Sequence, residues 1–241
     1  MTGRRQGVLL SMLFLALQAV APSTAEVHVA AAVSLQRPLQ ELGERYPMRL
    51  QWGGSVRLAH QLLQGAPADL FVTADAREID RLVEAGLVRP SQRCTLTSNR
   101  LAVVVARGAS RPTAIDELMQ LERVAVANAA NAPLGRYTAQ ALSQLGVELG
   151  RRAIPAAHAR QTIEYVARGE VDAAIVYRSD ALRFSERVEI ALLLPAEAHE
   201  TIRYEAAILE STRRTEALFR VLCNDEALFL RHGFSAWPGQ R

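Results

Sequence analysis

Short apolar runs alternate with stretches of helical periodicity along most of the chain. The first three apolar runs are 27–32, 50–52 and 70–73, and helical patterns begin after them at Leu35, Val56 and Ala76. This alternation is typical of βαβ units, which place successive strands in parallel and cover the sheet with helices. The pattern therefore predicts an α/β protein built on a mainly parallel sheet flanked by helices.

A second series of strands and helices starts in the middle of the chain. The apolar run 101–106 leads into a polar loop, and new apolar runs follow at 124–127 and 173–177, with a helical pattern from Leu134 between them. An extended segment at 204–209 then precedes two more helical patterns. We expect two lobes: lobe 1 from residues 26–106 plus 205–241, and lobe 2 from residues 107–204.

The first 25 residues have the pattern of a cleavable signal peptide. Arg4 and Arg5 precede an apolar core over 8–21, and small residues stand at 23–25. The core is shorter than the roughly twenty residues that a spanning helix needs, and no cysteine stands directly after it. We expect an exported protein, without a lipid anchor, whose mature chain begins at Glu26.

The charged residues exclude several classes of function. The chain has 28 basic and 25 acidic residues, and all 28 basic residues are arginines. Without the first 25 residues the balance is 26 to 25, so we expect no charged surface for nucleic acid. The absence of lysine excludes Schiff-base chemistry and the P-loop lysine.

Two cysteines, Cys94 and Cys223, are the only ones in the sequence. In an exported protein they could form a disulfide. They could equally be two buried thiols that behave as small apolar side chains. The spacing alone does not decide between these alternatives.

Two serines stand at equivalent turns from an apolar strand into a helix. Ser34 follows the run 27–32, and Ser55 follows the run 50–52. Each hydroxyl is expected among the unpaired N–H groups of a helix start, where anions bind favourably. Either serine alone could also be a simple N-cap. The repetition of the arrangement favours an oxyanion site.

The mature chain resembles the molybdate-binding periplasmic proteins of ABC importers along nearly its whole length. Seven segments carry the resemblance in the family's order: 31–35 (AAVSL), 54–61, 65–75 (GAPADLFVTAD), 99–105, 133–137 (PLGRY), 175–180 (IVYRSD) and 231–234 (RHGF). The resemblance implies the two-lobed periplasmic binding protein fold of type II, with the ligand in a cleft between the lobes. It implies a monomer in the periplasm that delivers its ligand to a membrane permease.

The family's ligand contacts map onto five positions of this sequence. By the resemblance, hydroxyl groups of the two serines and of a tyrosine bind molybdate, together with backbone N–H groups at two helix starts of the second lobe. These positions are Ser34, Ser55, Leu134, Ala159 and Tyr177. No cofactor is implied, and molybdenum is bound only within the oxyanion. Tungstate, which is nearly the same size, is expected to bind as well.

The donor set is suited to an anion that carries no proton. Hydroxyl and N–H groups committed as donors satisfy a fully deprotonated dianion and discriminate against hydrogen phosphate, which needs an acceptor. Sulfate is also free of protons, so a binding protein for sulfate or another oxyanion remains an alternative. Tyr177 alone, at the end of an apolar run, could be an ordinary half-buried aromatic residue.

Near these positions, two aspartates are expected to have structural roles, and the role of one histidine is open. Asp75 is expected to be the N-cap of a helix over 76–85, and Asp69 to be a turn residue. His158 stands where the family has an acidic residue, beside Ala159; it could be a solvated loop residue or, if protonated, could strengthen dianion binding at low pH. Gly53, Gly54 and Val56 replace hydroxyl-bearing residues of the family.

Two further classes of function share this architecture. A hydrolase or transferase would need a nucleophile with a base, a metal cluster or paired carboxylates. The five histidines are scattered without the spacing of metal ligands, so no enzyme is expected. The second class is the ligand-sensing half of a transcription regulator. The signal peptide and the lack of a DNA-binding module argue against it.

Overall fold

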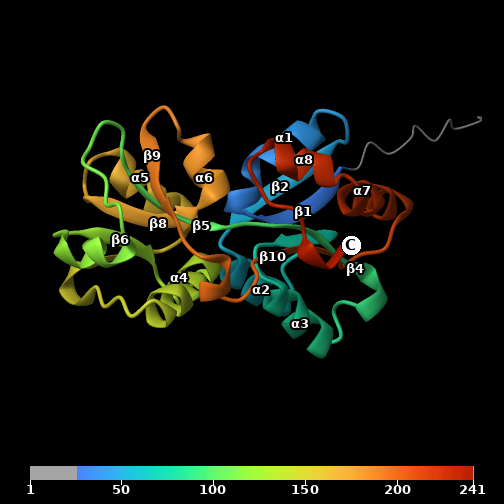
Figure 1. Cartoon of the computed structure of the whole chain (residues 1–241). Helices are drawn as coiled ribbons and strands as arrows, with labels where there is room; N and C mark the ends of the chain where they lie inside the picture. Colours follow the sequence, from blue (N-terminus) through green and yellow to red (C-terminus); the bar gives the residue numbers. More distant parts are fainter. Residues whose placement is uncertain (1–25, 241) are drawn as a thin grey trace, which may run out of the picture.

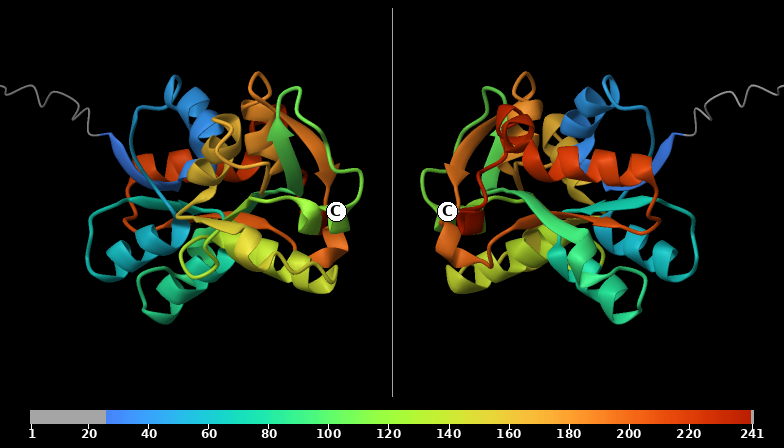
Figure 2. Two further views of the ribbon diagram at one scale, coloured as in Figure 1. Left: turned by 90° about the vertical axis from the view of Figure 1, so that its left-hand side faces the viewer. Right: turned by 90° about the vertical axis from the view of Figure 1, so that its right-hand side faces the viewer.

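The computed structural model of the chain describes residues 26–240, which form two α/β lobes lying side by side (Figure 1). Each lobe contains one five-stranded sheet. Figure 2 shows, from either side, that helices cover both faces of each sheet. The predicted signal peptide lies outside the described residues.

Lobe 1 contains the sheet β2-β1-β3-β10-β4. The strands β1, β2 and β3 are parallel, whereas β10 runs antiparallel between β3 and β4. The strands are β1 (Val27–Ala32), β2 (Met48–Gly53), β3 (Leu70–Thr73), β4 (Arg93–Ser98) and β10 (Arg203–Ile208). The helices are α1 (Gln36–Gly43), α2 (Ser55–Leu63), α3 (Ala76–Glu84), α7 (Arg213–Asn224) and α8 (Glu226–Arg231).

Successive side chains of the lobe 1 strands point alternately to the two helix layers that cover the sheet. In β1, Val29 and Ala31 face the cluster that contains residues of α1, α7 and α8, while Ala30 faces the cluster formed with α2 and α3. Strand β3 repeats the pattern, because Phe71 points to the second cluster and its neighbours Leu70 and Val72 to the first. A sheet covered on both faces needs such continuous apolar strands.

Lobe 2 contains the sheet β7-β6-β8-β5-β9. Strands β6, β7 and β8 are parallel, and β5 runs antiparallel between β8 and β9. The strands are β5 (Leu101–Ala106), β6 (Val124–Ala127), β7 (Ala153–Ala156), β8 (Ala173–Tyr177) and β9 (Val188–Leu193). The helices are α4 (Pro133–Gln144), α5 (Ala159–Ala167) and α6 (Arg178–Arg183).

The two-lobed fold predicted from the sequence is confirmed, with one correction to the boundary between the lobes. Each sheet is mainly parallel as predicted, because four of its five strands run in one direction and a single strand, β10 in lobe 1 and β5 in lobe 2, runs against them. The strand 101–106 was assigned to lobe 1, but β5 is hydrogen bonded between β8 and β9 of lobe 2. The first crossing between the lobes is therefore at residues 99–100, between β4 and β5, and not after residue 106. An apolar run shows that a strand is buried without showing which sheet it joins.

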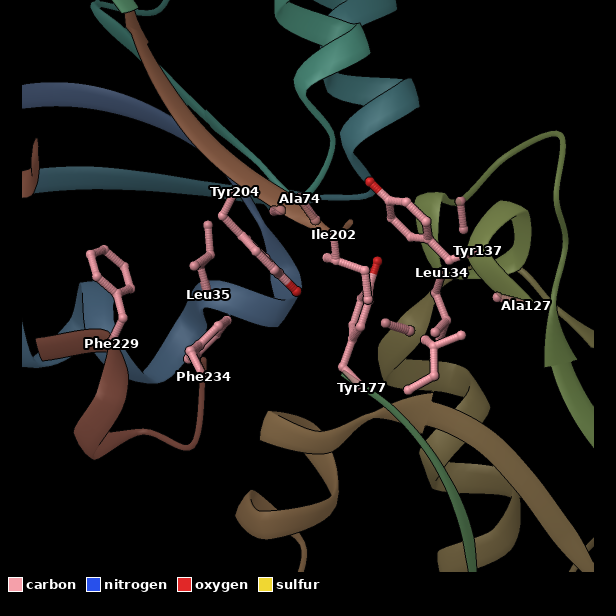
Figure 3. Close-up of a cluster of buried hydrophobic side chains, with 14 of the residues drawn as sticks. Leu35, Ala74, Ala127, Leu134, Tyr137, Tyr177, Ile202, Tyr204, Phe229 and Phe234 are labelled. Carbon is pink, nitrogen blue, oxygen red and sulfur yellow. The ribbon is translucent and has the colours of Figure 1, made fainter. Parts of the chain in front are cut away.

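The chain returns to lobe 1 through residues 194–202, between β9 and β10. At the first crossing, the Asn99 side chain donates to Ser179 Oγ at 2.8 Å and to Tyr204 Oη at 3.2 Å, which joins residues of both lobes. Beside these hydrogen bonds, buried apolar side chains from both lobes pack together in one cluster (Figure 3).

Cys94 and Cys223 form a disulfide, with their Cα atoms 6.0 Å apart. The bond joins β4 to α7, so it holds the C-terminal helices of lobe 1 against the edge strand next to the crossing. This resolves the alternatives left open by the sequence. From residue 26 to residue 240, none of the helices has the length and apolar character required to cross a membrane.

Candidate functional site

A small pocket lies between the two lobes, and all five residues predicted to bind the ligand line it. This interlobe pocket has a cavity volume of about 20 Å³, which suits a small ion and is far below the space that a large organic ligand needs. Its lining residues are Ala32, Val33, Ser34, Gly53, Gly54, Ser55, Ala74, Ala132, Pro133, Leu134, His158, Ala159 and Tyr177.

Helix starts from both lobes converge on the interlobe pocket. The N-cap residues of α2, α4 and α5 are Gly54, Ala132 and His158, and each of them lines the pocket. The first N–H groups of a helix have no partner within the helix, and the helix dipole places partial positive charge there. Three such ends around one small cavity create a site for a negative charge without using a cationic side chain.

Ser55 is the first residue of α2 and is almost fully buried. Its Oγ accepts a hydrogen bond from the N–H of Ala74 at 3.1 Å, which engages the oxygen as an acceptor within lobe 1. The hydroxyl proton is then available for a ligand in the pocket. The N-cap of α2 is Gly54, so the alternative that Ser55 is a simple N-cap is wrong.

Ser34 lies in the single 3-10 turn, Val33–Leu35, that connects β1 to α1. The residue before this turn, Ala32, and the residue before α1, Leu35, are the N-cap positions, so Ser34 caps neither element. Ser34 is 8% exposed and lines the interlobe pocket. The turn between β1 and α1 therefore places Ser34 at the pocket wall, without a helix-capping role.

Tyr177 ends β8 and reaches the interlobe pocket from lobe 2. Its ring packs edge-on against Tyr204, with the ring centroids 6.0 Å apart, and Figure 3 shows the two rings within the buried cluster. The Tyr177 hydroxyl is buried and has no hydrogen-bond partner among residues 26–240. Burial raises the pKa of this hydroxyl well above its usual value, so it remains a donor.

Leu134 and Ala159 contribute by backbone position. Leu134 follows Pro133 at the start of α4, so its N–H is the first one that this helix offers. Ala159 is the first residue of α5. Gly135 fixes the approach of α4, because a Cβ there would lie 2.4 Å from the carbonyl oxygen of Ala127. Larger residues at position 135 would push this helix start away from β6.

His158 is held by a structural contact. Its Nδ1 accepts a hydrogen bond from the N–H of Gln161 at 3.1 Å, which makes His158 the N-cap of α5. It is therefore not an unattached loop residue, as one alternative had it.

The lining of the interlobe pocket contains no carboxylate and no guanidinium group among the described residues. An ion pair between the two lobes joins Arg136 of α4 to Asp75, which is also the N-cap of α3 as predicted. Its two charges compensate one another beside the pocket. This pair is not apparent from the sequence, because its partners are 61 residues apart. Asp69, assigned to a turn, accepts from the N–H of His28.

The described part of the chain contains no group of three or more residues that could hold a metal ion. The site is chemically a set of neutral donors: three hydroxyls and the first N–H groups of helices from both lobes. Such a set can bind an anion that offers only acceptors. It contains no paired acid and base positioned to transfer a proton to a bound substrate.

The fold and the interlobe pocket define a two-lobed binding protein of the kind that holds a small ligand between its lobes. The chain belongs to the bacterial extracellular solute-binding protein family, whose model matches residues 27–234.

Two curated relatives are similar over most of the chain. The ABC transporter substrate-binding lipoprotein YvgL of Bacillus subtilis is 31% identical, with 86% of this chain and 85% of the relative covered. The molybdate-binding protein ModA of Escherichia coli is 30% identical, with coverage of 87% and 89%. The family and these relatives are transport proteins and not enzymes.

Solved structures confirm the fold. The periplasmic molybdate-binding protein of Azotobacter vinelandii superposes with a TM-score of 0.75 at 22% identity, covering 88% of this chain and 100% of that one. The sulfate-binding protein SubI of Mycobacterium tuberculosis gives a TM-score of 0.73 at 15% identity, with coverage of 89% and 88%. At these identities the likeness concerns the fold alone.

Proposed function

We propose that this protein captures molybdate, and tungstate with it, and delivers the anion to the permease of an ABC importer. The proposal is supported by similarity to molybdate-binding relatives and by a pocket lined with neutral donors. The protein acts by binding alone: the lobes close on the anion and present the closed surface to the permease. We place it, as a monomer, in the periplasm after removal of a signal peptide.

One observation carries the proposal: the buried Tyr177 hydroxyl has no partner among the described residues although it lines the interlobe pocket. A buried polar group without a partner costs about 1–3 kcal/mol. An oxyanion in the pocket would accept from this hydroxyl and remove the penalty. Ser34 and Ser55 would donate from lobe 1, and Leu134 and Ala159 from lobe 2.

The uncharged lining explains why the ligand is a proton-free dianion. Each oxygen of molybdate or tungstate accepts hydrogen bonds and donates none, which matches a site of donors. Hydrogen phosphate would place its O–H against another donor, because no carboxylate lines the pocket in the described residues. The site therefore favours molybdate and tungstate over phosphate.

Sulfate binding is the second candidate function. Sulfate is also a proton-free dianion, and a sulfate-binding protein has the same fold. Because the donor types are the same for both anions, the choice depends on the size of the cavity. The dimensions of this cavity change when the lobes close on a ligand. A binding experiment is therefore needed to decide between molybdate and sulfate.

Isothermal titration calorimetry of residues 26–241 with molybdate, tungstate, sulfate and phosphate tests the proposal. We expect tight binding of one molybdate or tungstate per chain, and much weaker binding of sulfate at the same site. Tight sulfate binding without molybdate binding would overturn the assignment.

The variant Ser55→Ala tests the donor set. It removes one donor to the anion and also the acceptor of the Ala74 N–H, so both affinity and stability are expected to fall. Full molybdate affinity in a folded Ser55→Ala protein would remove Ser55 from the site.

A further inference from the structure

A second pocket, separate in its chemistry from the interlobe pocket, lies between α6 of lobe 2 and α1 and α8 of lobe 1. Its cavity volume is about 260 Å³. Four arginines line it, together with one buried carboxyl group, and we call it the arginine pocket. These residues are Arg37, Arg178, Arg183, Arg231 and Asp180.

The arginines of this pocket come from both lobes. Arg37 and Arg231 belong to helices of lobe 1, whereas Arg178 and Arg183 belong to α6 of lobe 2. Burial is the main cause that lowers the pKa of Arg183, and the nearby positive charges of Arg160 and Arg37 lower it further. The lobes therefore bring like charges together where they meet.

The charges of the arginine pocket are only partly compensated. Arg231 pairs with Glu41 at 2.6 Å, and Glu41 also contacts His232 at 2.7 Å. Arg178 donates to the carbonyl of Gly233, and Arg183 to the side chain of Gln36. Both of these acceptors are uncharged. Across residues 26–240, Arg37 has neither a hydrogen bond nor an ion pair, so guanidinium donors remain free for an anion.

Asp180 adds an acceptor to this basic pocket. The residue is 4% exposed, and its Oδ2 atom is buried without a hydrogen-bond partner within the described chain. A ligand that combines negative oxygens with one O–H group would satisfy both kinds of group at once. Guanidinium groups bind the negative oxygens, often with two parallel hydrogen bonds, and the carboxyl group accepts the proton of the O–H.

We propose that the arginine pocket is a second anion site, specific for hydrogen phosphate or a small phosphate monoester. Its donor and acceptor set is the complement of the interlobe pocket, which offers donors alone. An anion bound there would join cations of the two lobes and thereby stabilise their closed arrangement. The site shares Ser34 with the interlobe pocket, so the two anions would be neighbours across one turn. This proposal does not depend on which anion the interlobe pocket binds.

The test is calorimetric titration of inorganic phosphate into the protein at pH 7.5, with and without saturating molybdate. We expect one phosphate per chain in both titrations, and weaker binding of sulfate, which has no proton for Asp180. Arg37→Ala is expected to weaken phosphate binding by about tenfold, because it removes a charge-assisted contact. Asp180→Asn should reduce the preference for phosphate over sulfate.

The matched control is Arg111→Ala, which removes an exposed arginine of lobe 2 outside the pocket and should leave phosphate binding unchanged. Absence of saturable phosphate binding, or equal phosphate affinity in wild type and Arg37→Ala, would overturn the proposal. Molybdate affinity is measured in a separate titration, so failure of the arginine pocket and failure of the proposed function are distinguishable. Arg37 is exposed and on the surface of α1, so its replacement leaves the fold intact.

Discussion

Arg136 of α4 and Asp75 at the start of α3 form an ion pair that joins the two lobes beside the interlobe pocket. The Asp75 side chain is only 2% exposed, and burial of Arg136 leaves its Nε and Nη2 atoms without further partners among the described residues. Gln36 of lobe 1 adds a second contact, because Arg160 and Arg183 of lobe 2 both donate to it. These contacts join the two lobes beside the interlobe pocket.

We predict that Asp75→Asn weakens ligand binding by about 10- to 100-fold, since a hydrogen bond to a charged group contributes about 1.5–3 kcal/mol. Asparagine retains the N-cap of α3, so the variant isolates the ion pair from the cap. Calorimetry measures the affinity, and small-angle scattering measures how far the lobes close on adding ligand.

The control for this prediction is Glu200→Gln, which breaks the exposed pair between Glu200 and Arg77. Both side chains of that pair are about half exposed, so its loss is expected to change affinity little. If Asp75→Asn binds and closes like the wild type, the Arg136 pair does not stabilise the closed state.

Tyr177→Phe separates ligand binding from stability. The variant removes only the buried hydroxyl, which has no partner in the described protein, so the unliganded protein should be as stable as wild type or slightly more stable. Molybdate affinity should fall by about tenfold or more, because a donor to a charged ligand is lost. Thermal unfolding without ligand and calorimetry with ligand provide the two measurements. Unchanged affinity would exclude the hydroxyl as a ligand contact.

Asp180 makes stability depend on pH. Burial raises the pKa of Asp180 from 3.8 to about 7, so the folded state holds a proton that the unfolded state releases above about pH 4. Asp180 therefore does not lower the free energy of unfolding below about pH 4. At pH 7 or above it lowers this free energy by about 4 kcal/mol. Asp180→Asn should match wild type near pH 4 and exceed it in stability at pH 8. Urea unfolding at both pH values measures the difference, and parallel pH profiles for the two proteins would contradict the expectation.

The disulfide between Cys94 and Cys223 closes a separation of 129 residues. Its removal in a Cys94→Ala, Cys223→Ala protein is expected to destabilise the fold by about 2–5 kcal/mol. Denaturant unfolding of the wild type should show the same loss after reduction, whereas the double variant should not respond to reductant. A wild type that is insensitive to reductant would mean that the bond does not contribute.

Local signals in the sequence were enough to place the lobe 1 part of the pocket. Ser34 and Ser55 each follow a short apolar strand, and the turn after such a strand lies at the edge of the sheet where ligands bind. Tyr177 needed the resemblance to a family, because a tyrosine after an apolar run is usually an ordinary core residue.

Contacts between distant segments could not be predicted in this way. The partners Asp75 and Arg136 lie in different lobes, and nothing local to either residue identifies the other. Strand β5 was assigned to the wrong lobe for a related reason: its apolar residues satisfy either sheet, and only pairing with β8 and β9 decides. The arginine pocket likewise forms from three helices that are far apart in sequence.

The central claim is that an oxyanion lies among Ser34, Ser55, Leu134, Ala159 and Tyr177. A crystal structure of the tungstate complex tests it most directly, because the anomalous scattering of tungsten locates the ion independently of the protein model. We predict one tungsten peak in the interlobe pocket, with oxygens within hydrogen-bonding distance of the three hydroxyls and the two backbone N–H groups. A peak in the arginine pocket alone, or no ordered tungsten in crystals grown with excess tungstate, would contradict the account.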